Sequence, residues 1–306
     1  MKVIPISFDS FGVRSMATFV KTEKVKIFID PGVALGPIRY GLPPTPEEIL
    51  ALEINKKRIK EEAQSSNVLI VTHYHYDHHP FPGDSFLYEC FNKKIVFAKD
   101  VNKDIHPSGI KRGKIFEEEV KRRGELIFCD GKNFNVEDVY IEFSRAVWHG
   151  EVNSKVGKVI MVYIEHNKDS FVFGSDAQSL ADPLALSWFI EKNPKIAILD
   201  GYPTIFLGWR LSNKSFEKAL QNLKKAVEST QTKTIILDHH IVREKDYKKR
   251  MEEFFRFCEE NGKKVYTAAE FLGMENLFLE AWRKEIHEKK KEVNVKDYYE
   301  KLKKIQ

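Results

Sequence analysis

The segment VTHYHYDHHPF (residues 71–81) decides how this chain is interpreted, because it places four metal-ligand side chains within six positions as HxHxDH. In an extended strand, side chains two residues apart point to the same side, so His73 and His75 can face one metal ion. If the chain turns after the strand, Asp77 and His78 can reach a second ion. Imidazole and carboxylate ligands without a thiolate suit zinc, manganese or iron. The alternative is a polar loop with incidental histidines, and the density of ligands directly after an apolar strand argues against it.

Two ions need more ligands than this segment supplies, and three later segments offer them. His149 lies in AVWHG, Asp176 in FGSDAQ, and His239 and His240 lie in ILDHH. Each follows an apolar run that is typical of a strand, so each side chain would project from one edge of a sheet. Any one of them alone is compatible with a purely structural role. Together with HxHxDH they predict one metal centre.

Nine apolar runs that end in polar or turn residues predict the strands of the fold. They are VKIFID (25–30), NVLIVTH (67–73), KIVFAKD (94–100), ELIFCD (125–130), VYIEFSRAVWH (139–149), KVIMVYIEH (158–166), SFVFGSD (170–176), KIAILDG (195–201) and KTIILDHH (233–240). Helical patterns cover 46–64, 213–229, 245–261 and 268–288, whereas 36–46 and 99–114 are interpreted as loops, the second one basic. Strands dominate the first half and alternate with helices in the second, which favours a layered α/β sandwich over a strictly alternating parallel sheet.

Length and composition add limits of their own. The chain has 306 residues, 42% of them hydrophobic, with a net charge of +5. The length alone suggests about two domains. Ligands from residue 73 to 240 must converge on one site, however, which predicts a single domain over 1–306 with an inserted helical lobe at about 37–66 and a C-terminal helical extension at about 268–306.

Three dispersed cysteines argue against a disulfide framework. No signal peptide or long apolar run is evident, so the cytoplasm is the expected location and no membrane contact is expected.

The order of these motifs resembles a known superfamily. Asp30 in FIDPG, then HxHxDH, His149, Asp176 and a histidine after a late strand are similar to the five motifs of the metallo-β-lactamase-fold hydrolases. This resemblance implies a four-layer αββα sandwich. More narrowly, SFGVRSMATFV, IDPGVALGPIRYGLPP and THYHYDHHPF resemble an uncharacterised family found mainly in archaea and thermophilic bacteria. The resemblance covers residues from about 7 to 245.

The resemblance implies a ligand set and supporting residues. The first ion would be held by His73, His75 and His149; the second by Asp77, His78 and the late histidine; and Asp176 would bridge both ions. Similar proteins favour His240 as the late ligand, whereas counting from the strand favours His239. Asp30 matches a position whose carboxylate would orient a ligand imidazole, although a turn carboxylate before Pro31 is an equal alternative. His79 would support the site or contact the substrate.

Two close cations, most simply Zn²⁺ with Mn²⁺ or Fe as alternatives, would activate a shared water as hydroxide, with Asp77 or the bound water handling the proton. Positively charged side chains near such a site favour an anionic phosphodiester or nucleotide-type substrate, or RNA. The residues expected at its mouth include basic and aromatic side chains: His106, Lys111, Arg112 and Tyr202, with Arg39, Tyr40, Trp209 and Arg210.

Other functions are typical of different versions of these motifs. Lactone and thioester hydrolases of the superfamily often carry Gly-Gly after HxHxDH, whereas this chain has His79 and Pro80. Di-iron oxidoreductases of the same fold usually have an acidic residue at the position of His75. The Asp-His-His phosphoesterases match ILDHH superficially but need a DxD pair that this chain lacks. A non-catalytic binding protein with a metal-occupied site is the alternative from another class.

Overall fold

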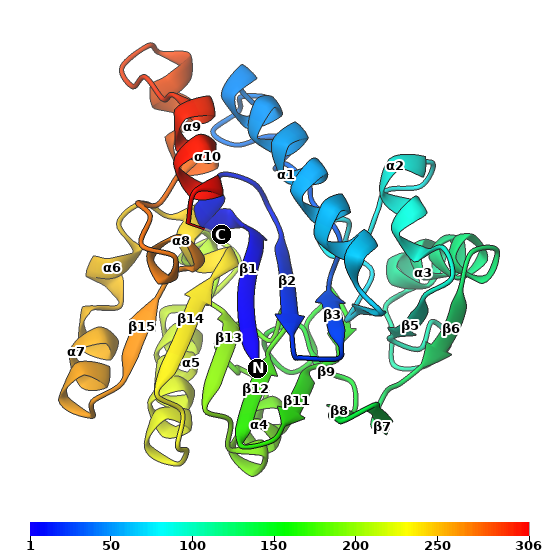
Figure 1. The fold of residues 1–306 in the computed structure, drawn as a ribbon. Coiled ribbons are helices and arrows are strands. Elements are labelled where there is room, and N and C mark those ends of the chain that lie inside the picture. The colour runs from blue at the N-terminus through cyan, green and yellow to red at the C-terminus, as the bar shows by residue number, and fades with distance from the viewer. Residues whose placement is uncertain (306) are drawn as a thin grey trace.

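Two β-sheets pack face to face at the centre of the molecule, and helices cover their outer faces (Figure 1). The computed structural model describes residues 1–305. The first sheet has the order β1-β2-β3-β4-β5-β6, antiparallel from β1 to β3 and parallel from β3 to β6. Its strands are β1 (Lys2–Phe8), β2 (Met16–Lys21), β3 (Lys26–Ile29), β4 (Val68–Val71), β5 (Ile95–Ala98) and β6 (Glu125–Phe128).

The second sheet has the order β15-β14-β13-β12-β11-β8-β7, with β12 to β15 parallel. Its strands are β7 (Asn133–Val136), β8 (Val139–Phe143), β11 (Val162–His166), β12 (Asp169–Phe173), β13 (Ile196–Asp200), β14 (Thr234–Asp238) and β15 (Lys264–Tyr266). A short ribbon pairs β9 (Val147–Trp148) with β10 (Lys158–Val159). Each of the nine predicted runs contains a strand, and the αββα layering confirms the predicted fold class.

Residues in the second sheet alternate between two hydrophobic cores. Ile198 and Ile236 pack into the core between the sheets, whereas Leu199 and Leu237 pack against the outer helices. This alternation follows from the two-residue period of a strand, and apolar residues on both faces are what a covered parallel sheet requires. The outer helices are α4 (Pro183–Lys192), α5 (Asn213–Glu228), α6 (Tyr247–Arg250) and α7 (Glu252–Glu260).

The first sheet is covered mainly by α1 (Pro46–Ser65), which lies in the segment 37–66 that the sequence suggested as an inserted lobe. Thr45 and Glu48 form a capping box at its start, with Pro46 in the first turn. The helix connects the parallel strands β3 and β4, so it is the crossover of a βαβ unit within the layered fold.

The predicted C-terminal extension contains α8 (Ala268–Phe271), α9 (Leu279–His287) and α10 (Val295–Lys303). Helix α10 packs on α1, and the hydroxyl of Tyr299 donates a hydrogen bond to the carbonyl oxygen of Phe11. Figure 1 shows α9 and α10 beside the start of α1. The final residue of the predicted range, 306, lies outside the described residues.

Two interpretations of the sequence were wrong. The basic segment 99–114 is a loop only in its first part, because α3 (Pro107–Lys121) begins there with Pro107 in its first turn. The nine predicted runs also did not include β1, β2, β7 and β15. β1 contains Pro5, which an edge strand tolerates although proline cannot donate a backbone hydrogen bond. No described helix is long and apolar enough to cross a membrane.

Candidate metal centre

The ends of five strands bring the predicted ligands to one place. The segment 73–78 follows β4, His149 follows β9, Asp176 follows β12 and His239 follows β14, while Asp30 directly follows β3, the strand next to β4. The short helices α2 (Ser85–Tyr88) and η2 (Glu89–Phe91) follow the HxHxDH segment. Ligand sites at the carboxyl ends of parallel strands are the usual outcome of such a topology.

The HxHxDH turn is fixed by close backbone contacts with the segment after β3. Asp30, in a left-handed conformation with φ of 52°, accepts hydrogen bonds from the backbone and hydroxyl of Thr72 at 2.8 and 2.7 Å. A Cβ atom on Gly32 would lie 2.2 Å from the backbone nitrogen of His79, so only glycine allows this approach. The turn closes with a hydrogen bond of 2.9 Å from the His78 nitrogen to the His75 oxygen.

His73, His75, His149 and Asp176 form the first donor group, and each of them offers a ligand atom within 4.8 Å of the others. Oδ2 of Asp176 lies 2.9 Å from Nε2 of His149 and 3.5 Å from Nε2 of His73. Three imidazoles and one carboxylate oxygen around a small space are a donor set that suits Zn²⁺.

Asp77, His78 and His239 form the second donor group. The other carboxylate oxygen of Asp176, Oδ1, lies 3.0 Å from Nε2 of His78 and 3.6 Å from Nε2 of His239. Asp77 Oδ2 lies 3.6 Å from the same His239 nitrogen. Asp176 therefore presents one oxygen to each donor group.

Several of these donor atoms are buried without a hydrogen-bond partner among the described residues. They include Nε2 of His73, His78 and His149 and both carboxylate oxygens of Asp176. Buried polar atoms are almost always paired, because leaving one unpaired costs about 1–3 kcal/mol. A group of unpaired donors that converge on one another fits a metal ion.

The other ring nitrogens of the histidines are held by neighbouring side chains. The pairs are His78 with Asp30 (2.7 Å), His239 with Asp9 (2.6 Å), His149 with Gln178 (3.1 Å) and His240 with Asp200 (2.8 Å). A partner on Nδ1 fixes the ring orientation. Nε2 of His78 and of His149 is then left without a partner among the described residues, whereas Nε2 of His239 lies 3.1 Å from Nη2 of Arg243. Asp30 therefore occupies the supporting position that the sequence suggested. His79 is buried beside Tyr74 and Phe116.

Burial and charge separate the histidines into two types. Burial lowers the pKa of His75 to about 3 and that of His73 well below its usual value, so both rings are neutral. Burial opposes the charged form of His78 and His239 as well, but carboxylates overcome it. Asp176 and Asp30 raise the pKa of His78, and Asp9 and Asp176 raise that of His239 to about 10.

The geometry distinguishes the two adjacent late histidines. His239 joins Asp77 and His78 in the second donor group, whereas His240 falls in a different group with Asp176 and His239. His239 has a left-handed conformation with φ of 64°, which turns the chain directly after β14. The geometry therefore favours His239, the alternative in the sequence interpretation, over His240.

A cavity of about 1070 Å³ opens over the two donor groups. His75, Asp77, His149, Asp176 and His240 line its floor. Its other lining residues include five cationic side chains: Arg14, Arg112, Lys155, Arg210 and Arg243.

Of the residues that the sequence predicted at the mouth of the site, Arg112 and Arg210 line the cavity. The others lie outside its lining: His106, Lys111, Tyr202, Arg39, Tyr40 and Trp209. His106 is the N-cap of α3 and Lys111 is exposed on that helix. Tyr202 is buried, and its hydroxyl donates to Glu151, which does line the cavity.

The sequence did not identify several residues around the donor groups. Asp9, Gln178 and Asp200 orient histidines, and Arg14 and Arg243 line the cavity. Asp200 and Asp9 stand at strand ends, as the ligands do, and that position was the only local signal available.

Solved structures with the same fold place the chain in a class. CmlA, a diiron beta-hydroxylase from Streptomyces venezuelae, matches with a TM-score of 0.53 and 11% identity over 82% of this chain and 51% of that one. The metallo-beta-lactamase fold protein YhfI from Bacillus subtilis matches with 0.50 and 11% identity over 83% and 88%, respectively. A possible metal-dependent hydrolase from Veillonella parvula matches with 0.50 and 13% identity over 83% and 94%. The protein has the metallo-β-lactamase fold.

Sequence comparison identifies the family within that class. No protein-family model matches the chain. The UPF0282 protein of Korarchaeum cryptofilum is 40% identical over 289 residues, which cover 94% of this chain and 95% of that protein. The one from Pyrococcus furiosus is 42% identical over 298 residues, covering 94% and 92%. The chain belongs to the UPF0282 family, which is consistent with the archaeal family suggested by its motifs.

Proposed function

We propose that this protein is a metal-dependent hydrolase that acts on a phosphodiester or nucleotide-type substrate. The observation that carries the proposal is the carboxylate of Asp176, whose two oxygens face two separate buried donor groups on the floor of one cavity. A shared carboxylate between two imidazole-rich donor sets is suited to a pair of divalent cations.

His73, His75 and His149 would hold one ion, Asp77, His78 and His239 the other, and Asp176 would contact both. Zn²⁺ suits this donor set best, with Mn²⁺ and Fe as alternatives. When bound, two divalent cations lower the pKa of a coordinated water and polarise the bond that is broken. His78 and His239 would release their protons when metal binds, since only the neutral ring is a ligand.

The chain's own residues would position the substrate and handle protons. Burial opposes ionisation of Asp77, but His78 and His239 hold its pKa below the usual range, so it is charged and suited to hold a metal ion. His240 lines the cavity, and because Asp200 occupies Nδ1, the ring has Nε2 left for a substrate oxygen. A hydrogen bond there would orient the substrate.

Aromatic and cationic groups on one wall favour a nucleotide. Tyr76 stacks on Phe81 with ring centroids 4.2 Å apart, and the Arg112 guanidinium lies 4.7 Å from the Tyr76 centroid. Aromatic faces bind nucleobases by stacking, and guanidinium groups bind phosphates. Lys155 and Arg210 add positive charge to the cavity lining.

A lactone or thioester hydrolase would use the same donor groups, and so would a non-catalytic protein that only binds metal. A di-iron oxidoreductase is supported by the fold alone, through CmlA. Against it, His75 stands in the first donor group where an acidic residue is expected for that chemistry.

A panel of substrates tests the proposal. Bis-p-nitrophenyl phosphate, a short RNA, a homoserine lactone and a glutathione thioester are assayed in parallel with the wild-type protein and with His75→Ala. We expect phosphodiester cleavage that is lost in His75→Ala. Turnover of only the lactone or thioester would contradict the substrate class, and activity that survives the substitution would contradict the metal-dependent mechanism.

A further inference from the structure

Arg14 enters the cavity from the segment between β1 and β2, and it is held there rigidly. Its backbone exchanges two hydrogen bonds of 2.9 Å with Ala34. Its side chain donates to both carboxylate oxygens of Glu280 on α9, from Nε at 2.7 Å and from Nη2 at 2.6 Å. Among the described residues no group pairs with the remaining nitrogen, Nη1.

Arg243 reaches the same cavity from the turn after β14, beside the second donor group. Its Nε donates to Oδ1 of Asp9 at 2.7 Å, and its Nη2 lies 3.1 Å from Nε2 of His239 and 3.6 Å from Oδ2 of Asp77. The other oxygen of Asp9 holds His239. One carboxylate therefore fixes both a proposed metal ligand and a cavity arginine.

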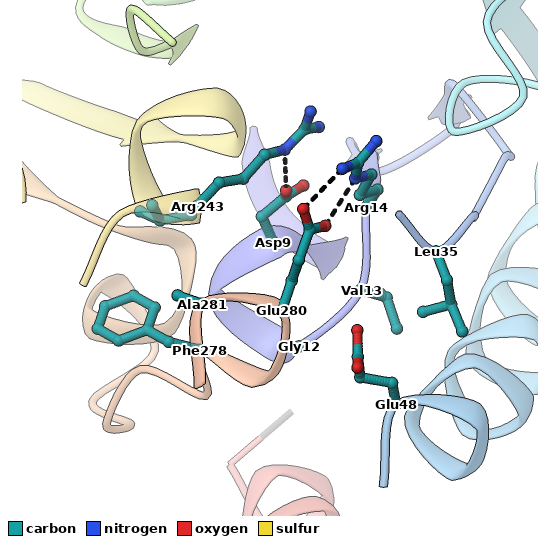
Figure 2. Close-up of a pocket in the computed structure, with 11 residues that line it drawn as sticks. Asp9, Gly12, Val13, Arg14, Leu35, Glu48, Arg243, Phe278, Glu280 and Ala281 are labelled. Carbon is teal, nitrogen blue, oxygen red and sulfur yellow. Dashed lines mark hydrogen bonds and ion pairs between the residues drawn. The ribbon is translucent and has the colours of Figure 1, made fainter. Parts of the chain in front are cut away.

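The two arginines and the carboxylates that bind them, Asp9 and Glu280, surround the same narrow pocket. Both line the large cavity and also the narrow pocket between η1 (Asp9–Phe11) and α9 that Figure 2 shows. In that view the guanidinium groups of Arg14 and Arg243 extend past the carboxylates of Asp9 and Glu280 in the same direction. Burial tends to raise the pKa of Glu280, but the hydrogen bonds and charge of Arg14 and the charge of Arg243 lower it.

We propose that Arg14 and Arg243 form an anion subsite that binds a phosphate group of the substrate next to the metal centre. The identity of the anion rests on the proposed function. A guanidinium presents several N–H donors in a plane, so one edge can be held by a carboxylate while the rest contacts phosphate oxygens. Because Glu280 and Asp9 already fix the two side chains, little side-chain entropy remains to be lost on binding.

The subsite also gives the C-terminal extension a role. Glu280 lies on α9, and three residues later the fully buried Arg283 anchors that helix. Arg283 donates to both oxygens of Glu48, at 2.9 and 2.7 Å, and to the carbonyl oxygen of Gly36 at 2.7 Å. Gly36 in turn packs against the Arg14–Glu280 pair. The extension therefore positions Arg14 through Glu280 and braces the loop beside it.

The test is binding of inorganic phosphate to the full-length protein, measured by calorimetry in the metal-free and Zn²⁺-loaded forms. The double variant Arg14→Met/Glu280→Met removes the pair without changing the net charge and keeps similar side-chain volume. Arg14→Lys keeps the charge but loses the forked geometry. The control Lys301→Met/Asp297→Met removes an exposed ion pair of 2.8 Å on α10 in the same extension.

We expect phosphate binding to weaken about 10- to 100-fold in the double variant, as for loss of a charge-assisted contact, and by less in Arg14→Lys. The control should bind as the wild type does. If the double variant does not fold, the phosphate affinity of Arg14→Lys relative to the wild type decides the test. Affinity within twofold of the wild type in the Arg14 variants, or no phosphate binding by the wild type, would overturn the subsite. A wild-type protein that cleaves only lactones or thioesters but binds phosphate through Arg14 would instead refute the proposed function alone.

Discussion

Oδ2 of Asp176 lies 2.9 Å from Nε2 of His149, and both atoms are buried without a hydrogen-bond partner among the described residues. Their side chains are only 1% and 4% exposed. Water therefore has little access to these polar atoms, and a group that binds between them must offset the free-energy cost of their burial. A divalent cation does this, and the same argument applies to Oδ1 of Asp176 and Nε2 of His78.

Removing metal should therefore destabilise the protein. A ligand that binds only the folded state at a thousand times its Kd contributes about 4 kcal/mol, which corresponds to about 10 °C in Tm for a chain of this size. Thermal unfolding is measured after chelation and dialysis, and again after Zn²⁺ is restored. The same Tm in both states would show that the donor groups do not bind the ion in the folded protein.

The two late histidines should differ in metal content. We expect His239→Ala to lose about one equivalent of metal, because it removes a donor from the second group. His240→Ala is the matched control, since it removes the neighbouring ring and should retain about two equivalents. Elemental analysis of the purified variants decides between them. Loss of metal in His240→Ala with full occupancy in His239→Ala would reverse the assignment.

Asp9→Asn should weaken metal binding without removing a ligand. Asp9 accepts from Nδ1 of His239 at 2.6 Å, and loss of such a partner typically costs about 10- to 100-fold in metal affinity or activity. Competition with a chromophoric chelator measures the affinity. Asp138→Asn is the control, because that carboxylate contacts His166 far from the donor groups. Equal affinities in Asp9→Asn and the wild type would rule out this supporting role.

The sequence predicted the donor set because most of its signal is local. The four ligands in HxHxDH and the single residues after apolar strands can be recognised from the sequence alone. Strand ends then gather at one edge of a sheet. The choice between His239 and His240 was not accessible, because β14 ends at Asp238 and the left-handed turn at His239 breaks the alternation of side chains. Counting from the strand favoured His239, whereas resemblance to similar proteins favoured His240, so the sequence left the choice open.

The supporting contacts were inaccessible for a different reason. Asp9 and His239 are 230 residues apart, and Arg14 and Glu280 are 266 apart. No local pattern links such pairs, and each residue alone is an ordinary charged side chain. Only the packing of η1 and α9 against the turn after β14 brings them together. The basic segment 99–114 drew attention because its charges are adjacent in sequence, yet only Arg112 from it lines the cavity.

Gly32→Ala should destabilise the fold and disturb the metal centre together. A Cβ atom there would lie 2.2 Å from the His79 nitrogen and 2.4 Å from the His78 carbonyl carbon, so the turn that carries His75 to His78 would have to move. We expect a loss of about 3 kcal/mol, the upper end for overpacking. Chemical denaturation measures the stability, and elemental analysis measures the metal. A variant with wild-type stability and full metal content would show that this close approach is not required.

The central claim is that two metal ions share the carboxylate of Asp176. Anomalous diffraction at the zinc edge from crystals of the Zn²⁺-loaded protein tests it most directly. We expect two peaks, one beside His73, His75 and His149 and the other beside Asp77, His78 and His239, with Asp176 between them. No peak in this cavity, or a single peak with the other donor group empty at saturating Zn²⁺, would contradict it.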